Sequence, residues 1–170
     1  MDLAQMIRDV PDFPVKGILF KDITTLIKDP AAFREAVDRM AAPYEGMEID
    51  LVAAIESRGF IFGAPLAYKL GAGFVPVRKP GKLPAETISA SYTLEYGTNT
   101  LEIHKDAVRP GQRVLLVDDL LATGGSAKAA ATLIEQLGGK VVGVAFLIDL
   151  TFLHGVEKLT GYDVRSIIQF

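Results

Sequence analysis

The stretch VLLVDDLLATGGS, residues 114–126, is the part of the chain that indicates its fold most clearly. Four apolar residues precede two adjacent acids, two leucines and a turn that contains two glycines. After the turn, apolar residues recur at helical spacing until a second pair of glycines. They are Ala127, Ala130, Leu133, Ile134 and Leu137. The stretch therefore predicts a buried strand over residues 114–117, then a loop, then a helix.

The alternation of strand and helix continues along the rest of the chain. Short apolar runs predict three further strands, over residues 51–55, 74–77 and 141–148. In the second of these, Pro76 indicates an edge strand or a bulge. Helices are predicted over residues 60–70, ending at Gly71, and from Pro30 to about residue 42. This order is typical of an α/β protein with a central, mainly parallel sheet flanked by helices, and 170 residues fit a single domain, 1–170.

One segment does not fit the alternation. Residues 79–100 are rich in Gly, Pro, Ser, Thr and charge. A connection of this length inside a compact domain is often a lid over a functional site. The alternative is a solvated hairpin.

Composition excludes several classes of protein. The net charge is -3 and the pI is about 5.4, which argues against nucleic acid as a partner. The sequence has no cysteine, so disulfides and thiolate metal sites are excluded. The apolar stretch 141–150 is too short to span a membrane, and residues 1–9 do not resemble a secretory signal. We therefore expect a soluble cytoplasmic protein with no membrane partner.

The chemistry of residues 114–126 points to a ribose phosphate. Glycines let a backbone approach a ligand closely, and the amino end of the following helix favours a phosphate. Two carboxylates beside a phosphate are reasonable if they face hydroxyls, or a metal that the ligand carries. The loop lacks the Lys of a nucleoside-triphosphate P-loop and is not the glycine pattern of dinucleotide folds. The alternative is a tight turn with two solvated acids.

The same stretch resembles the ligand motif of type I phosphoribosyltransferases, and its form DDLLATGG is similar to that of the adenine phosphoribosyltransferases. Six further blocks match this family in order. They are PDFP (11–14), GILFKDI (17–23), ESRGF (56–60), RKPGKLP (78–84), ASYTLEYG (90–97) and LEIHKD (101–106). The resemblance covers nearly the whole chain. It implies the type I phosphoribosyltransferase fold, with a small hood at about residues 1–28 and a flexible catalytic loop at about residues 79–105.

The resemblance also implies how 5-phosphoribosyl 1-pyrophosphate is held. The 5-phosphate falls to Ala122, Thr123, Gly124, Gly125 and Ser126. The ribose hydroxyls fall to Asp118 and Asp119. A Mg²⁺ ion is expected to arrive with the pyrophosphate, bound by substrate oxygens and water, with no direct side-chain ligation expected.

Cations are expected to meet the pyrophosphate. Arg58 follows a predicted strand and precedes a helix, which is a good position for binding an anion. The family uses this Arg on pyrophosphate, and it implies the same role for Arg78, Lys79 and Lys82. Ordinary surface charge is the alternative for one of these last three. By the same resemblance, the bond between Glu56 and Ser57 is a candidate cis peptide.

The remaining roles concern the base. The resemblance makes Glu95 the group that accepts a proton from the purine, and Tyr96 a residue that helps to close the loop. Phe20 and Leu150 would enclose the ring, and backbone groups near Leu19 and Lys21 would read its edge. Phe20 and Leu150 could equally be plain core residues. His104 and His154 lack metal-ligand spacing and are assigned no chemistry.

The function that the resemblance implies is transfer of a phosphoribosyl group to adenine, giving AMP and pyrophosphate. One alternative is a phosphoribosyltransferase for another base, such as guanine, xanthine, hypoxanthine or orotate. A second is a regulator that senses 5-phosphoribosyl 1-pyrophosphate without turning it over. The resemblance also implies a homodimer.

Overall fold

The centre of the molecule is a five-stranded sheet in the order β4-β3-β7-β8-β9. The computed structural model describes residues 1–94 and 96–170. In that order the strands are Gly73–Val77, Leu51–Ile55, Arg113–Leu121, Lys140–Asp149 and Val164–Gln169. Every neighbouring pair is parallel, which confirms the predicted sheet. The strand with Pro76, β4, lies at the edge, where a residue without an N–H is tolerated.

Helices cover both faces of the sheet. On one face, α2 (Pro30–Ala41) and α3 (Arg58–Leu70) pack on buried residues of β3, β7 and β8. On the other, α4 (Gly125–Gln136) packs over a second buried cluster. The Asp29 carboxylate accepts a hydrogen bond from Ala32 N at 2.9 Å and caps α2, and Gly71 ends α3 at φ 69°. Helices α3 and α4 begin two residues earlier than predicted, at Arg58 and Gly125, because their first residues are glycine and polar residues rather than apolar ones.

Strand β7 is longer than the apolar pattern predicts. The pattern ends at residue 117, but pairing with β8 continues from Asp118 opposite Phe146 to Leu121 opposite Asp149. Backbone pairing does not require apolar side chains, so the strand continues through the two acids. Asp118 and Asp119 therefore lie on the rigid carboxyl end of a central strand rather than in a loop.

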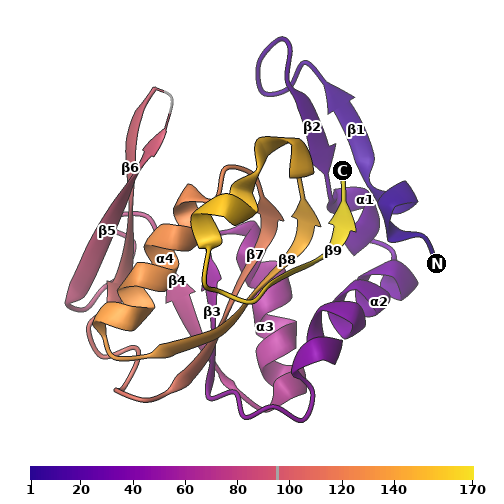
Figure 1. Cartoon of the computed structure of the whole chain (residues 1–170). Helices are drawn as coiled ribbons and strands as arrows, with labels where there is room; N and C mark the ends of the chain where they lie inside the picture. The colour runs from indigo at the N-terminus through magenta and orange to yellow at the C-terminus, as the bar shows by residue number, and fades with distance from the viewer. Residues whose placement is uncertain (95) are drawn as a thin grey trace.

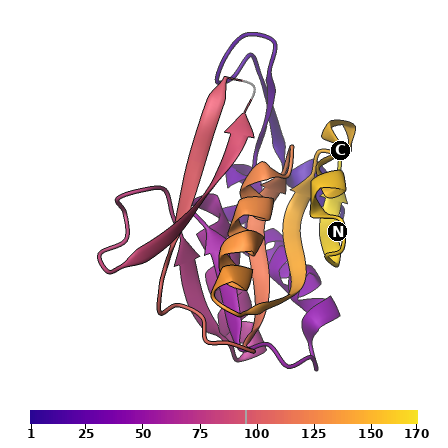
Figure 2. The ribbon, with the colours of Figure 1, turned by 60° about the vertical axis from the view of Figure 1, so that its left-hand side comes forward.

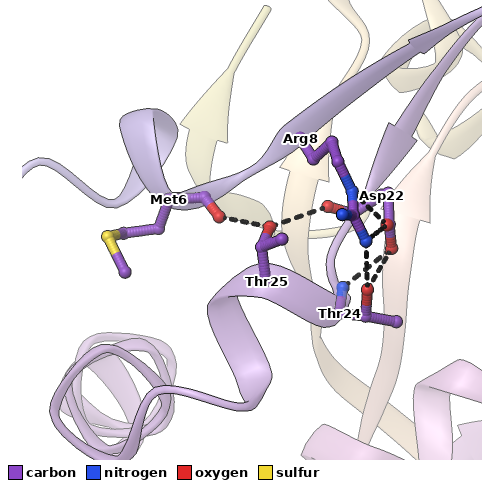
Figure 3. Close-up of polar contacts among 5 residues, drawn as sticks. All are labelled: Met6, Arg8, Asp22, Thr24 and Thr25. Carbon is purple, nitrogen blue, oxygen red and sulfur yellow. Dashed lines mark hydrogen bonds and ion pairs between the residues drawn. The ribbon is translucent and has the colours of Figure 1, made fainter.

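The first 28 residues, which are predicted to form a hood, lie together at one end of the chain's fold. They comprise η1 (Leu3–Met6), the antiparallel strands β1 (Arg8–Pro11) and β2 (Leu19–Asp22), and α1 (Thr24–Ile27). Asp22 accepts hydrogen bonds from Arg8 Nη2 at 2.7 Å, Thr24 N at 2.9 Å and Thr24 Oγ1 at 2.7 Å (Figure 3). The Thr24 hydrogen bonds, followed by Arg8, lower the pKa of Asp22 from 3.8 to about 2. Thr25 Oγ1 donates to Met6 O at 2.6 Å and joins η1 to α1 (Figure 3).

The long connection folds as an antiparallel hairpin of β5 (Thr87–Leu94) and β6 (Gly97–His104). Its secondary structure is thus a hairpin, the alternative to a lid that the sequence leaves open. Its base is buried at Leu101 and Ile103, and His104 Nε2 accepts from Ala85 N at 3.3 Å, a structural role. The hairpin and the hood both rise beyond the carboxyl ends of the central strands (Figures 1 and 2).

Three short 3-10 turns complete the described chain. They are η2 (Ala42–Tyr44), η3 (Thr151–Leu153) and η4 (Gly155–Leu159). Turns η3 and η4 connect β8 to β9 and lie at the same end of the sheet as the carboxyl end of β7 (Figure 1). In the part of the chain that the structure describes, no helix has the length and apolar character that crossing a membrane requires.

Candidate active site

A cavity of about 230 Å³ lies at the carboxyl end of β7. Ligands of parallel α/β sheets bind at this end of the strands. Six of the seven residues predicted to hold the ribose phosphate line it, namely Asp118, Asp119, Ala122, Thr123, Gly124 and Ser126. The seventh, Gly125, is the first residue of α4 and lies directly between two of them in the chain. The structure therefore brings the whole predicted phosphoribosyl set together.

The loop from residue 122 to 126 is shaped by contact with η4. Gly124 has φ +88°, in the left-handed region that favours glycine, and a Cβ there would lie 2.5 Å from Gly155 O. A Cβ on Gly155 would in turn collide with the carbonyl oxygen of Ala122. Two glycines thus allow two backbone segments to touch. The contact fixes the loop in front of the amino end of α4, which favours an anion.

The two acids of β7 have different surroundings. Asp119 is buried, and its Oδ2 accepts a hydrogen bond from Arg58 Nε at 2.6 Å. Burial raises the pKa of Asp118 above its usual range, and the neighbouring Asp119 carboxylate raises it further. Gly59 allows α3 to approach, since a Cβ there would lie 2.9 Å from Asp118 Oδ1. The end of the strand therefore carries a buried carboxylate, paired with a half-exposed Arg, beside a carboxyl group whose pKa is raised.

A second cavity, of about 210 Å³, adjoins the first and shares Arg58, Asp118 and Asp119 with it. Its other lining residues are Glu56, Ser57 and Lys79. The peptide bond between Glu56 and Ser57 is cis, as predicted. Arg58 is the first residue of α3, so its backbone also lies at a helix amino end. An anion that extends from the first cavity would meet the cations here.

The four predicted pyrophosphate residues lie in different surroundings. Arg58 and Lys79 line the second cavity. Arg78 Nε instead donates to Glu56 Oε1 at 3.0 Å, and the same oxygen accepts from Lys79 N at 2.9 Å. Burial alone would raise the pKa of Glu56, but the hydrogen bonds from Lys79 and Arg78 lower it. Lys82 is exposed and, among the described residues, lines neither cavity.

Three of the predicted base-binding residues belong to β2 of the hood, and the fourth, Leu150, directly follows β8. The Arg58 guanidinium lies 5.6 Å from the ring centroid of Phe20, which also meets Phe13 edge-on at 5.1 Å. Leu150 N donates to Leu121 O at 3.0 Å, next to the first cavity. Leu19 is 52% exposed, and the Lys21 ammonium is held by Asp9 at 2.6 Å and lies 4.0 Å from the Phe170 ring centroid. Phe20 and Leu150 are thus partly buried beside the site rather than deep in the core.

Among the described residues, the hairpin residues that line the first cavity are two to which the resemblance assigns no role. Tyr96 is 93% exposed, so in this structure it does not close the site, and Glu95 lies outside the described residues. Tyr92 and Leu94 line the first cavity instead. Their alternate positions on β5 are the sequence signal for a strand face that points toward the site. Phe146 and Gly155 were also missed, because each reads as ordinary strand or turn sequence.

Comparison with known proteins agrees with this geometry. A family model described as a phosphoribosyl transferase domain matches residues 24–167. The adenine phosphoribosyltransferase of Thermoanaerobacter sp. (strain X514) is 62% identical over 169 residues, which cover 99% of this chain and 98% of the relative.

Two crystal structures extend the comparison. The adenine phosphoribosyltransferase of Thermoanaerobacter pseudethanolicus has a TM-score of 0.96 at 62% identity, covering 99% of this chain and 98% of that one. The Saccharomyces cerevisiae enzyme, solved with an imino-altritol bisphosphate and adenine, has a TM-score of 0.91 at 41% identity, covering 97% and 96%. The chain belongs to the phosphoribosyltransferase family and, within it, to the adenine phosphoribosyltransferases.

Proposed function

We infer that the chain transfers the phosphoribosyl group of 5-phosphoribosyl 1-pyrophosphate to adenine, giving AMP and pyrophosphate in purine salvage. The observation that carries this is the match of 62% identity over 99% of the chain to an adenine phosphoribosyltransferase. The structure has a matching pair of cavities. The first is lined by residues of the loop 122–126, hereafter the phosphate loop, and is called the phosphate-loop cavity. It adjoins the second, which is lined by the cations Arg58 and Lys79. The base would enter between Phe20 of the hood and Leu150.

In the reaction, a bond forms between the purine nitrogen and the anomeric carbon while the bond from that carbon to pyrophosphate breaks. The loop at residues 122–126 would hold the 5-phosphate. Asp118 and Asp119 would accept hydrogen bonds from the ribose hydroxyls. Arg58 and Lys79 would stabilise the negative charge that develops on the leaving pyrophosphate. The raised pKa of Asp118 supports this arrangement, because a carboxyl group that ionises less readily repels the phosphates less.

We propose that Glu95 accepts the proton that adenine loses as its nitrogen attacks. Support comes from sequence position, since residue 95 follows Leu94, which lines the phosphate-loop cavity. A positioned base of this kind contributes about 10²–10⁴-fold to rate. A Glu95→Gln variant is expected to lower kcat by about that factor while the affinity for 5-phosphoribosyl 1-pyrophosphate is kept.

We propose Mg²⁺ as the accompanying metal. Among residues 1–94 and 96–170 no cluster of three acidic or histidine side chains could hold a metal ion by itself. Among the described residues, the carboxyl groups that line the phosphate-loop cavity are those of Asp118 and Asp119, and the latter is paired with Arg58. This donor set fits a hard cation that keeps several waters and is held mainly by substrate phosphates. When bound, the ion would neutralise charge on the pyrophosphate.

Further proposals concern the assembly, location and partners of the chain. We propose that the chain forms a homodimer, which sedimentation of the purified protein tests, and that it acts in the cytoplasm with neither nucleic acid nor membrane as a partner. The net charge of -3 supports the exclusion of nucleic acid.

A steady-state assay with a panel of bases tests the function. Adenine is expected to be consumed fastest, and omission of Mg²⁺ is expected to abolish the turnover. Faster consumption of hypoxanthine or orotate would refute the assignment of the base. Binding of 5-phosphoribosyl 1-pyrophosphate without turnover of any base would favour the regulator.

A further inference from the structure

Tyr92, on β5, lies where the hairpin meets the body of the molecule. Its side chain is in the wall of three cavities. One is the phosphate-loop cavity, the second is a groove of about 540 Å³ between the hairpin and α4, and the third is a cavity of about 320 Å³ beside Lys79. Among the described residues, Tyr92 alone lines all three cavities.

The ring of Tyr92 rests on the phosphate loop. A Cβ atom on Gly125 would lie 2.9 Å from Tyr92 Cδ2 and 3.5 Å from both Tyr92 Cβ and Cγ. Gly125 is the first residue of α4 and belongs to the predicted 5-phosphate set. Because Gly125 has no side chain, the aromatic ring can approach its backbone this closely. The contact is made by ring and Cβ carbons.

The packing of β5 against the body of the molecule ends at Tyr92. Ile88, Ala90 and Tyr92 alternate along β5 and pack against the buried cluster under α4. The next residue of this row, Leu94, is 44% exposed. Tyr92 is therefore the outermost packed side chain of the row, and the strand end beyond it extends over the phosphate-loop cavity.

We propose that Tyr92 is a positioning residue, which holds the β5–β6 hairpin against Gly125 and thereby sets where the tip of the hairpin stands over the phosphate loop. The catalytic consequence rests on the proposed function, because residue 95 follows three positions after Tyr92. The contact between Tyr92 and Gly125 does not depend on the proposed function. A tip that is misplaced by about 1 Å can reduce a rate by about 100-fold.

The first experiment needs no substrate. Hydrogen exchange over residues 87–104 is compared in the full-length protein and in its Tyr92→Ala, Tyr92→Phe and Gly125→Ala variants. Tyr92→Ala and Gly125→Ala are expected to speed exchange in the hairpin by about fivefold or more, because each separates the ring from the loop. Tyr92→Phe, which keeps the ring carbons, is expected to match the unaltered protein.

A double variant separates this contact from general damage. When Tyr92 is already Ala, a Cβ at residue 125 has room, so Gly125→Ala is expected to add little further hairpin exchange. Ser89→Ala is the control, since Ser89 is exposed, lies on the other face of the same strand and lines none of the three cavities. Additive effects of the two changes, or an equal effect of Ser89→Ala, would overturn the proposal.

The second experiment is kinetic. Tyr92→Ala is expected to lower kcat with adenine by about 10–100-fold, with less than a threefold change in the calorimetric Kd for 5-phosphoribosyl 1-pyrophosphate and Mg²⁺. Tyr92→Phe is expected to keep kcat. A loss in Tyr92→Phe as large as in Tyr92→Ala would assign the role to the hydroxyl and refute positioning. If the unaltered protein does not turn over adenine, the proposed function fails, while the exchange experiment still decides the contact.

Discussion

At the scale of single residues, the pair of Arg58 and Asp119 joins the two cavities. The Asp119 side chain is only 7% exposed, whereas that of Arg58 is 50% exposed. Removing the Arg would therefore leave a buried carboxylate without its cation, beside the place where pyrophosphate is proposed to lie. A buried charge without a partner costs more than the ion pair itself contributes.

Arg58→Ala is expected to reduce kcat/KM for 5-phosphoribosyl 1-pyrophosphate by about 10–100-fold, because a charge-assisted hydrogen bond contributes about 1.5–3 kcal/mol. Steady-state kinetics at fixed adenine measure this. Lys140→Ala is the matched control, since Lys140 is an exposed cation at the amino end of β8, whereas the cavities lie at the carboxyl ends of the strands. A change of less than threefold in Arg58→Ala would contradict a role on the leaving group.

The Asp22 carboxylate makes a prediction about pH. Hydrogen bonds from Thr24 and the pairing with Arg8 lower its pKa to about 2, so the folded state favours the charged form. Its contribution to stability is full above the ordinary value of 3.8 and is lost as the pH falls toward 2. The difference in Tm between the unaltered protein and Asp22→Asn should therefore shrink between pH 4 and pH 2. A difference that stays constant over that range would contradict the lowered pKa.

The sequence predicts some of these residues better than others. Asp118 and the glycines of the loop are found because a short contiguous motif carries them. Arg78 is predicted to meet pyrophosphate but pairs with Glu56 in this structure, and that pairing joins residues 22 positions apart, which no local pattern reveals. The resemblance assigns a role to Tyr96 and none to Tyr92, and only the packing of β5 shows that Tyr92 is partly buried while Tyr96 is exposed.

At the scale of elements, the phosphate loop depends on η4. The backbone of Gly155 touches the loop at Ala122 and Gly124, and a side chain at this position has no space. Gly155→Ala is expected to lower the free energy of unfolding by about 1–3 kcal/mol, the usual cost of overpacking. It should also raise KM for 5-phosphoribosyl 1-pyrophosphate, because the loop must move.

Chemical denaturation and initial-rate kinetics measure the two effects of Gly155→Ala. Gly73→Ala, in the edge strand β4, is the control, because a Cβ there meets only the flexible end of Leu51 at 3.0 Å and Asp50 O at 3.8 Å. Equal changes in KM for the two variants would show that the loop does not depend on η4.

Elements whose side chains are buried on both faces are predictable from the sequence. Strands β3, β7 and β8 lie in the middle of the sheet and read as continuous apolar runs. Strand β9 is not predicted, because its edge position leaves polar residues such as Arg165 and Gln169 exposed within it. The extension of β7 through Asp118 and Asp119 is missed for a related reason, since a charged pair interrupts the apolar pattern but not the backbone pairing.

At the scale of the whole molecule, stability is expected to be uneven. The central sheet has five mutually paired strands, whereas the β5–β6 hairpin pairs only with itself along most of its length. An isolated two-stranded hairpin is marginal in water, so the hairpin depends on its packing against α4. The hairpin should therefore open locally, at a lower free energy than global unfolding.

Native-state hydrogen exchange measures this difference. Amides of β7 are expected to exchange only by global unfolding, and those of β5 near Tyr92 and Leu94 much faster. Binding of 5-phosphoribosyl 1-pyrophosphate with Mg²⁺ is expected to slow exchange in the hairpin if it closes on the ligand. Equal protection of β5 and β7 without ligand would contradict an independently opening hairpin. The sequence alone leaves lid and hairpin as alternatives, and the structure shows that one segment has the pairing of a hairpin and the position of a lid.

The backbone contact between Gly124 and Gly155 has a consequence for how the protein is made. The ribosome produces the phosphate loop about thirty residues before the turn that supports it, and β9 follows that turn. A nascent chain that has emerged only as far as α4 carries every residue of the phosphate motif but lacks the Gly155 backbone that touches its loop. Affinity for the sugar phosphate should therefore arise late in translation, after β8 has paired and η4 has emerged. Ribosome-bound chains arrested before and after residue 155 would differ in their ability to bind the substrate.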